Sequence, residues 1–223
     1  MSKISVLGSL NMDLVTSVDR APNMGETVLG ESFKTVCGGK GGNQAMAIAR
    51  LGGNIEMLGC VGNDSYGKIL KENLNNDGAK TDNIEEKEAS SGIAAITVSG
   101  GDNCIIVVKG ANDLVTKEYV DTHKNVIEES DYLVMQLEIP FETVEYAMKT
   151  AKESNTKVVF NPAPMDKKCI SLIPYVDIFV VNEHEAGIVT GETVVTEKDA
   201  EIAIKKLLEM GAKTVVVTLG EKD

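Results

Sequence analysis

The chain has 223 residues, of which 43% are hydrophobic and 25% charged, the composition of a folded globular protein. Its 22 basic and 34 acidic side chains give a formal net charge of −12. Nucleic acids and anionic membrane surfaces are bound largely through clustered Lys and Arg, so neither is expected as a partner. The length fits one large domain or one domain with an appendage.

The cysteines do not indicate a disulfide or zinc framework. None of the four belongs to a CxxC pair, and the two histidines do not complete a zinc pattern. We therefore expect reduced thiols at Cys37, Cys60, Cys104 and Cys169. No apolar stretch approaches the roughly 18 residues of a membrane span. The N-terminus runs directly into a strand-like segment without a signal-peptide layout, which predicts a cytoplasmic protein.

The first half of the chain mixes strand and helix patterns. Short apolar or alternating runs bounded by Gly and Pro predict strands, and runs of good helix formers closed by Gly predict helices. Strands are expected at 4–8, 13–19, 26–36 and 55–61, and helices at 44–51 and 65–76. Residues 92–110 contain two apolar runs separated by a glycine-rich turn, which predicts a hairpin.

The second half alternates regularly between helix and strand. Helices are expected at 116–129, 141–154, 183–190 and 196–210, and strands at 132–137, 157–160, 177–181 and 214–218. Continuous apolar strands alternating with amphipathic helices predict an α/β fold whose mostly parallel sheet is flanked by helices. Segments 13–36 and 92–110 do not fit that alternation, so we place them together as a small antiparallel sheet.

Polar residues follow the first strand. Asn11 and Asp13 lie two apart in an extended segment and point the same way, which offers one amide and one carboxylate to adjacent sugar hydroxyls. Ligands of open α/β sheets bind at the carboxyl ends of strands, where this pair is expected. The alternative interpretation is an Asx turn followed by a solvated acid.

A glycine cluster, residues 38–43, precedes the first expected helix and includes Lys40. Glycines let the backbone approach a ligand closely, and a helix N-terminus favours negative charge. The cluster matches neither the Walker pattern nor GxGxxG. A simple turn between strand and helix is the alternative.

Other strand ends also carry polar side chains. Glu138 follows one strand, Asn161 begins a Pro-rich turn after the next, and Thr218 is followed by Leu219 and Gly220. Asn182 and Glu185 lie three apart at an expected helix start and so share one face. That pair suits a hydrated Mg²⁺, or else caps the helix with Asn182 as N-cap and Glu185 reaching back.

The motifs taken together resemble the ribokinases of the PfkB carbohydrate kinase superfamily. The matching stretches occur in family order along the whole chain: GSLNMD (8–13), PNMGET (22–27), GGKGGNQA (38–45), VGND (61–64), MQLE (135–138), NPAP (161–164), NEHEA (182–186) and TLG (218–220). The GGKGxNQA form together with MQLE and NPAP favours ribokinase over fructokinase or adenosine kinase.

The resemblance implies a Rossmann-like domain with a β-sheet lid, and Mg·ATP-dependent phosphorylation of D-ribose at its 5-hydroxyl. It implies ribose binding by Asn11, Asp13, Gly39, Lys40, Asn43 and Glu138. It implies ATP binding by Asn182, Glu185, Thr218 and Gly220, with Glu185 reaching Mg²⁺ through water. The family also uses a monovalent cation, K⁺, and its lid closes over the sugar and forms a dimer interface. On this basis the chain is one α/β domain, 1–223, with its lid at about 13–36 and 92–110.

One family signature is absent from the sequence. The GAGD-type turn supplies the catalytic Asp and the anion hole in the family, and it has no counterpart here. We therefore expect a chain truncated at its C-terminus, with no catalytic residue of its own and slow or absent phosphoryl transfer. Two alternatives remain open: a non-catalytic sugar-binding or regulatory protein, and a kinase for another polyol such as deoxyribose or a nucleoside.

Overall fold

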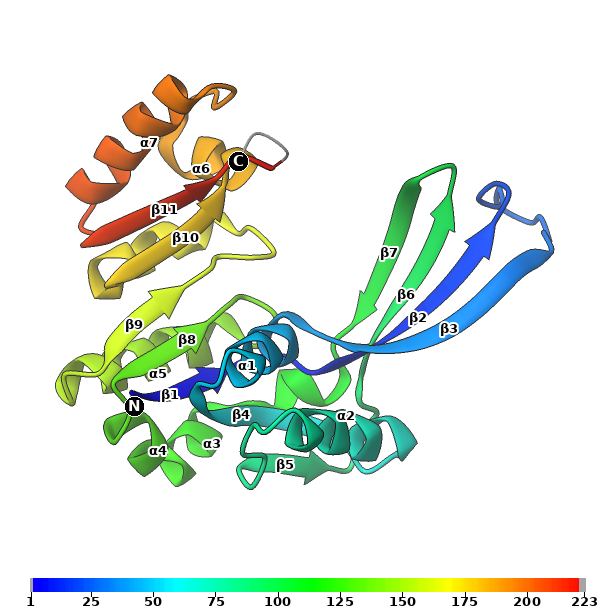
Figure 1. The fold of residues 1–223 in the computed structure, drawn as a ribbon, viewed down its shortest axis with the longest axis horizontal. Coiled ribbons are helices and arrows are strands. Elements are labelled where there is room, and N and C mark those ends of the chain that lie inside the picture. Colours follow the sequence, from blue (N-terminus) through cyan, green and yellow to red (C-terminus); the bar gives the residue numbers. More distant parts are fainter. Residues whose placement is uncertain (1, 221–223) are drawn as a thin grey trace.

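The computed structural model describes residues 2–220, and its largest element is a seven-stranded sheet (Figure 1). All neighbouring strands in this sheet run parallel, in the order β11-β10-β9-β8-β1-β4-β5. The strands are β1 (Lys3–Leu7), β4 (Asn54–Gly62), β5 (Ile84–Lys87), β8 (Tyr132–Met135), β9 (Lys157–Phe160), β10 (Ile178–Asn182) and β11 (Thr214–Thr218). Parallel pairing requires crossover connections, which the intervening helices supply.

Helices connect and cover these strands. They are α1 (Lys40–Arg50), α2 (Ser65–Asn76), α3 (Lys117–Thr122), α4 (Lys124–Glu128), α5 (Phe141–Glu153), α6 (Glu183–Thr190) and α7 (Glu197–Glu209), with 3-10 helices η1 (Gly110–Leu114) and η2 (Lys167–Tyr175). Several begin at side-chain caps: the Asp64 carboxylate accepts the Gly67 N–H at 2.8 Å at the start of α2. None of the helices in the described residues has the length and apolarity needed to cross a membrane.

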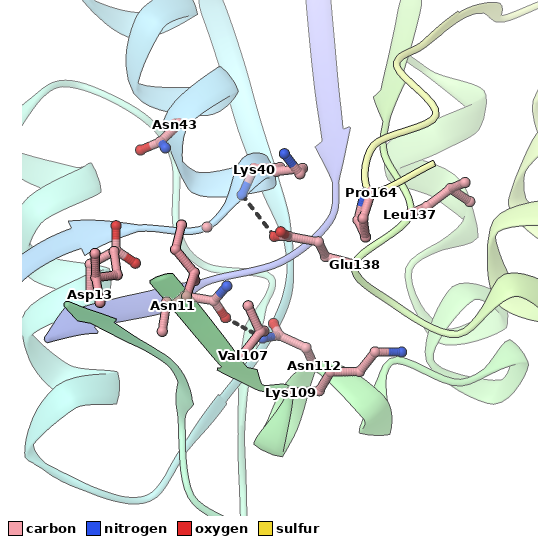
Figure 2. A pocket seen from close by; sticks show the side chains of 14 residues that line it. Asn11, Asp13, Lys40, Asn43, Val107, Lys109, Asn112, Leu137, Glu138 and Pro164 are labelled. Carbon is pink, nitrogen blue, oxygen red and sulfur yellow. Dashed lines mark hydrogen bonds between the residues drawn. The ribbon is translucent and has the colours of Figure 1, made fainter. Parts of the chain in front are cut away.

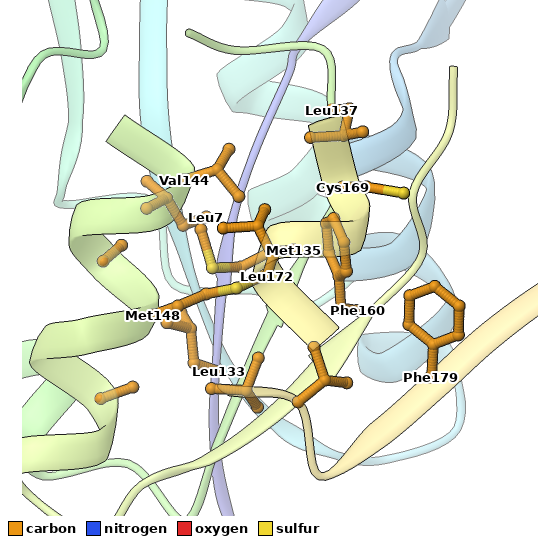
Figure 3. Close-up of a cluster of buried hydrophobic side chains, with 14 of the residues drawn as sticks. Leu7, Leu133, Met135, Leu137, Val144, Met148, Phe160, Cys169, Leu172 and Phe179 are labelled. Atoms are coloured by element: carbon orange, nitrogen blue, oxygen red, sulfur yellow. The ribbon is translucent and has the colours of Figure 1, made fainter. Parts of the chain in front are cut away.

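The two faces of the large sheet bury two separate cores. Adjacent strand residues point to opposite faces, so Leu7 packs in one cluster and Val6 in the other. The larger cluster joins the strands to α3–α7 and η2, with Phe160, Phe179 and Met148 fully buried (Figure 3). The smaller cluster lies under α1 and α2. These cores fix the carboxyl ends of the strands along one edge.

A second sheet of four strands projects from the domain (Figure 1). Its strands, in spatial order, are β3 (Gly30–Gly38), β2 (Asn11–Val18), β6 (Gly92–Ser99) and β7 (Asp102–Val108). We call it the small sheet. It is mixed and not purely antiparallel as expected, because β2 and β6 belong to different hairpins and meet side by side in parallel.

Four short links join the small sheet to the large one. They are residues 8–10, 39, 88–91 and 109, each between an element of one sheet and an element of the main domain. Glycines crowd these links: a Cβ at Gly92 would lie 2.2 Å from Asn11 Oδ1, and a Cβ at Gly39, where φ is 85°, would lie 2.7 Å from Asn11 N. The links therefore pass one another at backbone contact distance.

The expected elements are present, with four differences. The first helix begins at Lys40 and not at residue 44, so most of the glycine cluster forms its first turn. The helix expected at 116–129 breaks at His123 into α3 and α4. β5 and η2 were not expected, since IEEK carries too little apolar character and the second segment contains Pro174. The strand expected from residue 26 begins at Gly30.

Candidate functional site

The first candidate site is a cavity of about 430 Å³ between the small sheet and the strand ends of the large sheet. All six residues proposed from the resemblance to bind sugar line it, from β2, α1 and the turn after β8 (Figure 2). The lining comprises Asn11, Asp13, Gly39, Lys40, Asn43, Ala94, Ile96, Ile105, Val107, Lys109, Asn112, Leu137, Glu138 and Pro164. Asn11 and Glu138, about 130 positions apart in the chain, thus meet at one edge, as the strand-end argument predicts. Their roles in binding remain predictions.

Glu138 connects the end of β8 to the start of α1. Its Oε2 accepts the Lys40 backbone N–H at 3.0 Å and the Ser9 hydroxyl at 2.5 Å. A carboxylate at this position compensates the positive end of the helix dipole. The same contacts aim the first turn of α1, and with it the Lys40 side chain, at the cavity (Figure 2).

Asn112 is a lining residue that the sequence analysis missed. Its side chain is buried, with Oδ1 accepting the Leu10 N–H at 2.9 Å and Nδ2 donating to Asn11 Oδ1 at 2.8 Å (Figure 2). Because the oxygen of the Asn11 amide is engaged, its NH₂ group is left for the cavity. An Asn in a short 3-10 turn carries no distinctive sequence signal, so the link to Asn11, about 100 positions away, is visible only in the fold.

Asp13 is the second carboxylate of this cavity. Partial burial, reinforced by the negative charge of Glu138, raises the pKa of its carboxyl above the ordinary value. Gly38 lies directly beside it, and a Cβ there would fall 2.5 Å from Asp13 Oδ2. Glycine at position 38 therefore makes room for the carboxylate where β3 passes β2.

A second cavity, of about 330 Å³, lies on the other side of Lys40. It occupies the open face of the sheet beside α1, and its lining comprises Lys40, Gln44, Val134, Val159, Asn161, Ala163, Val180, Val181, Asn182, Glu185 and Thr218. Asn182, Glu185 and Thr218, three of the four residues proposed for ATP, therefore come together here. Gly220 is not among the lining residues; it follows in a left-handed conformation with φ of 61°.

Asn182 and Glu185 form a reciprocal cap at the start of α6. Asn182 Oδ1 accepts the Glu185 N–H at 2.7 Å, and Glu185 Oε2 accepts the Asn182 N–H at 3.0 Å. The capping interpretation is therefore correct as geometry. Both side chains also line the second cavity, so the cap holds one amide and one carboxylate at its wall.

Lys40 is the residue that the two cavities share. It is the first residue of α1, at the helix end that favours anions. The first cavity offers amides and carboxylates suited to hydroxyl groups, and the second offers the polar side chains of Gln44, Asn182 and Thr218 near the same helix end. The arrangement can hold a polyol and an anionic second ligand on either side of one ammonium group.

Comparison with known proteins places the sequence in a family. A family model described as pfkB family carbohydrate kinase matches residues 1–223. The chain is 42% identical to a ribokinase from Bacillus subtilis (strain 168), covering 100% of this chain and 76% of the relative. It is 37% identical to a deoxyribokinase from Salmonella typhi, covering 98% of this chain and 72% of the relative.

A solved structure shows the same fold. The structure of Arabidopsis thaliana ribokinase complexed with ribose and ATP matches with a TM-score of 0.90 at 29% identity, covering 99% of this chain and 73% of that one. The chain thus spans about three quarters of the length of these proteins. Because the family model matches along the whole sequence and the relatives align over nearly all of it, the chain belongs to the pfkB family of carbohydrate kinases.

Proposed function

We propose that this chain binds D-ribose in the first cavity and Mg·ATP in the second, for phosphoryl transfer to the 5-hydroxyl to give ribose 5-phosphate. The observation that carries the proposal is the position of Lys40, which lines both cavities at the N-terminus of α1. An ammonium group between acceptor and donor neutralises the charge of the transferred phosphoryl group. Placing the two ligands on either side of it supplies the proximity that the reaction requires.

In this proposal the first cavity binds the hydroxyl groups of the sugar through hydrogen bonds. Asn11 offers its NH₂ group, Asp13 and Glu138 accept hydrogen bonds from hydroxyl groups, and Asn43 adds an amide at the rim. Gly39 supports the site through its backbone, since no side chain fits at that position.

The small sheet contributes apolar residues, including Ile96 and Val107, that cover the ligand and exclude water.

The second cavity holds the nucleotide in this proposal. Thr218 and Gly220 lie at the end of β11, and Asn182 faces the phosphates from the start of α6. Mg²⁺ prefers oxygen ligands and keeps several waters, so one carboxylate beside nucleotide phosphates suits it. Glu185 fits this requirement, because its Oε2 is engaged by the cap while its side chain lines the cavity. The ion would neutralise charge on the phosphates.

We further propose that the 223-residue chain binds both ligands but transfers phosphate slowly. The GAGD-type turn is absent from its sequence, and no other residue is assigned as the base that accepts the hydroxyl proton. The K⁺ requirement and the cytoplasmic location stay predictions from the resemblance and the sequence. Two copies are proposed to pair through the exposed apolar residues of the small sheet.

Calorimetric titration of the chain with D-ribose and with ADP, beside a coupled assay for ADP release, tests the proposal. We expect binding of both ligands and little turnover. Failure to bind ribose would sink the sugar assignment, whereas turnover at an ordinary kinase rate would overturn the expectation of slow transfer. Ribose binding without nucleotide binding would favour the non-catalytic alternative.

A second sugar has a specific observation in its favour. The relative from Salmonella typhi that is 37% identical is a deoxyribokinase. Competition between D-ribose and 2-deoxy-D-ribose for the first cavity separates the two candidates. We expect ribose to bind more tightly, since a site that hydrogen-bonds a hydroxyl group loses that interaction with the deoxy sugar.

A further inference from the structure

The only two glutamines in the sequence, Gln44 and Gln136, bind each other. Gln136 follows β8 and is fully buried, and its Nε2 donates to Gln44 Oε1 at 2.5 Å. Gln44 lies on α1 and lines the second cavity. Neither residue is used by the function proposed above, although both belong to stretches that the sequence analysis singled out.

Gln136 is held in one orientation, although this orientation leaves one of its buried polar atoms without a hydrogen bond. Its Oε1 is buried and accepts no hydrogen bond within the described residues. That oxygen occupies the space beside Gly8, where a Cβ would lie only 2.0 Å away. The reversed amide would place its NH₂ group against Gly8, and an orphaned buried donor is rarer in proteins than an under-satisfied carbonyl. Gly8 thus makes room for the side chain, and the donor end is turned toward Gln44.

The orientation of Gln136 determines which polar atom of Gln44 remains available. Because its Oε1 accepts from Gln136, its remaining polar atom is the NH₂ group, which donates to no protein atom in residues 2–220 and is not buried. The side chain that carries it lines the second cavity. The pair therefore presents a fixed hydrogen-bond donor, and never an acceptor, to whatever the cavity holds.

We propose that Gln44 donates a hydrogen bond to the phosphate chain of the bound nucleotide, and that Gln136 is the positioning residue that sets its orientation. Gln44 follows Lys40 by four residues, so the two side chains share one face of α1. Lys40 lines both cavities, whereas Gln44 lines only the second. In this proposal Gln44 donates its hydrogen bond to the phosphates that stay with the nucleotide, and not to the phosphoryl group that is transferred. This inference rests on the proposed nucleotide function of the second cavity.

Titration of the chain with ADP tests the inference in three variants. Gln44→Met and Gln136→Met should each weaken ADP binding about tenfold, the value of one hydrogen bond to a charged group. The double variant should be no weaker than Gln44→Met, because the two side chains act through one donor. D-Ribose affinity should stay unchanged, since neither glutamine lines the first cavity. Ala47→Met, which adds the same side chain on an exposed position of α1, is the matched control.

Gln136→Glu separates positioning from simple structural support. At pH 8 the introduced carboxylate cannot donate, so Gln44 reverses its amide and presents an oxygen to the phosphates, weakening ADP binding. On acidification the protonated carboxyl donates again, and affinity relative to the wild type at the same pH should recover. A merely structural role predicts lower melting temperatures without this recovery.

The outcomes distinguish the inference from the function on which it rests. If the wild type binds ADP and the variants at Gln44 and Gln136 bind it equally well, the inference is overturned and the nucleotide site stands. If the wild type binds ribose but neither ADP nor ATP, the nucleotide function is wrong and the inference falls with it. Additive losses in the double variant would refute the coupling of the two side chains.

Discussion

Asp13 lines the first cavity together with a second carboxylate, that of Glu138. Partial burial and the negative charge of Glu138 both disfavour the ionised form of Asp13. Burial and the charge of Glu138 raise its pKa, so the folded chain keeps this proton to a higher pH than the unfolded chain. The stability that the protonated form contributes is therefore lost as the pH rises through the raised pKa. Above that pKa the ionised carboxylate lowers stability, and in the proposed function it serves sugar binding instead.

Asp13→Asn should raise the stability of the fold and weaken sugar binding at the same time. At pH 7 we expect a small rise in melting temperature and a loss of D-ribose affinity of about tenfold or more, since a charged acceptor is replaced by a neutral amide. The gain in stability should shrink as the pH falls through the raised pKa of Asp13, below which the wild-type carboxyl is protonated as well. Calorimetry and thermal melts at several pH values measure both effects. Unchanged ribose affinity would remove Asp13 from the sugar site.

Asn112 forms hydrogen bonds to Asn11, a lining residue of the first cavity, and to the preceding residue, Leu10. Asn112→Leu leaves the Leu10 N–H and the Asn11 Oδ1 without partners in a buried place. We expect a loss of about 1–3 kcal/mol in the free energy of unfolding, together with weaker ribose binding. Urea unfolding gives the first quantity and titration the second. Asn76→Ala, at an exposed position of α2, should change neither.

At the scale of elements, the position of α1 depends on how closely it approaches β1. The backbone beyond β1 passes the first turn of the helix, and a Cβ at Gly41 would lie 2.7 Å from Ser9 N. A Cβ at the next residue, Gly42, would meet only the Leu10 side chain at 3.2 Å and Ser9 O at 3.8 Å. Two adjacent glycines of one helix therefore face different constraints.

Substitution by alanine separates these constraints. Alanine favours a helix over glycine by about 1 kcal/mol, so Gly42→Ala should be nearly neutral or stabilising once Leu10 adjusts. Gly41→Ala should destabilise the fold and weaken ligand binding in both cavities, because the clash is with backbone and the helix must move. Urea unfolding midpoints compare the two variants. Equal midpoints would show that α1 is not seated by this contact.

The order of the helices and strands with clear sequence patterns was predictable from the sequence, whereas the pairing of the strands was not. Continuous apolar runs such as the one at 214–218 identify parallel strands, and the Asp64 cap marks the start of α2. The parallel pairing of β2 with β6 joins two hairpins about 80 residues apart, and no local pattern specifies it. The glycine cluster was expected to precede the first helix, whereas four of its residues form the first turn of α1, which packs closely against Ser9 although glycine is a poor helix former.

The candidate site was also predictable from the sequence only in part. Polar residues at strand ends, such as Asn11 and Glu138, could be placed on one rim from topology alone. Residues that act through other side chains could not: Asn112 contacts Asn11, and Gln136 contacts Gln44, only once the chain is folded. Such partners lie about 90 to 100 positions apart in sequence, beyond the range of any spacing argument.

On the scale of the whole molecule, the small sheet is apolar on both faces. Neighbouring strand residues point to opposite sides, so Ile105 lines the first cavity while Ile106 points away from it. Their exposed fractions are 52% and 69%, and Phe33 on β3 is 63% exposed. An apolar surface of this kind indicates an interaction site. It is the basis for the proposed pairing of two copies.

Sedimentation analysis of Ile105→Glu and Ile106→Glu tests the two faces separately. We expect the wild type to sediment as a dimer and one of the two variants as a monomer, because a buried charge without a partner is costly in an apolar interface. The variant that dissociates identifies the face that forms the interface. A monomeric wild type at high protein concentration would refute the proposed pairing.

The four links between the sheets determine how the small sheet can move. All of them lie together at its base, beside Asn11 and Gly92, and its strands are joined laterally by hydrogen bonds along their length. We therefore expect a sheet attached in this way to swing as a lever with its pivot at the base. The turn at Gly100 and Gly101 would travel furthest and Asn11 least. In the proposed function, the polar contacts at the base would then be in place before the sugar arrives, and only the apolar far end would act as the gate.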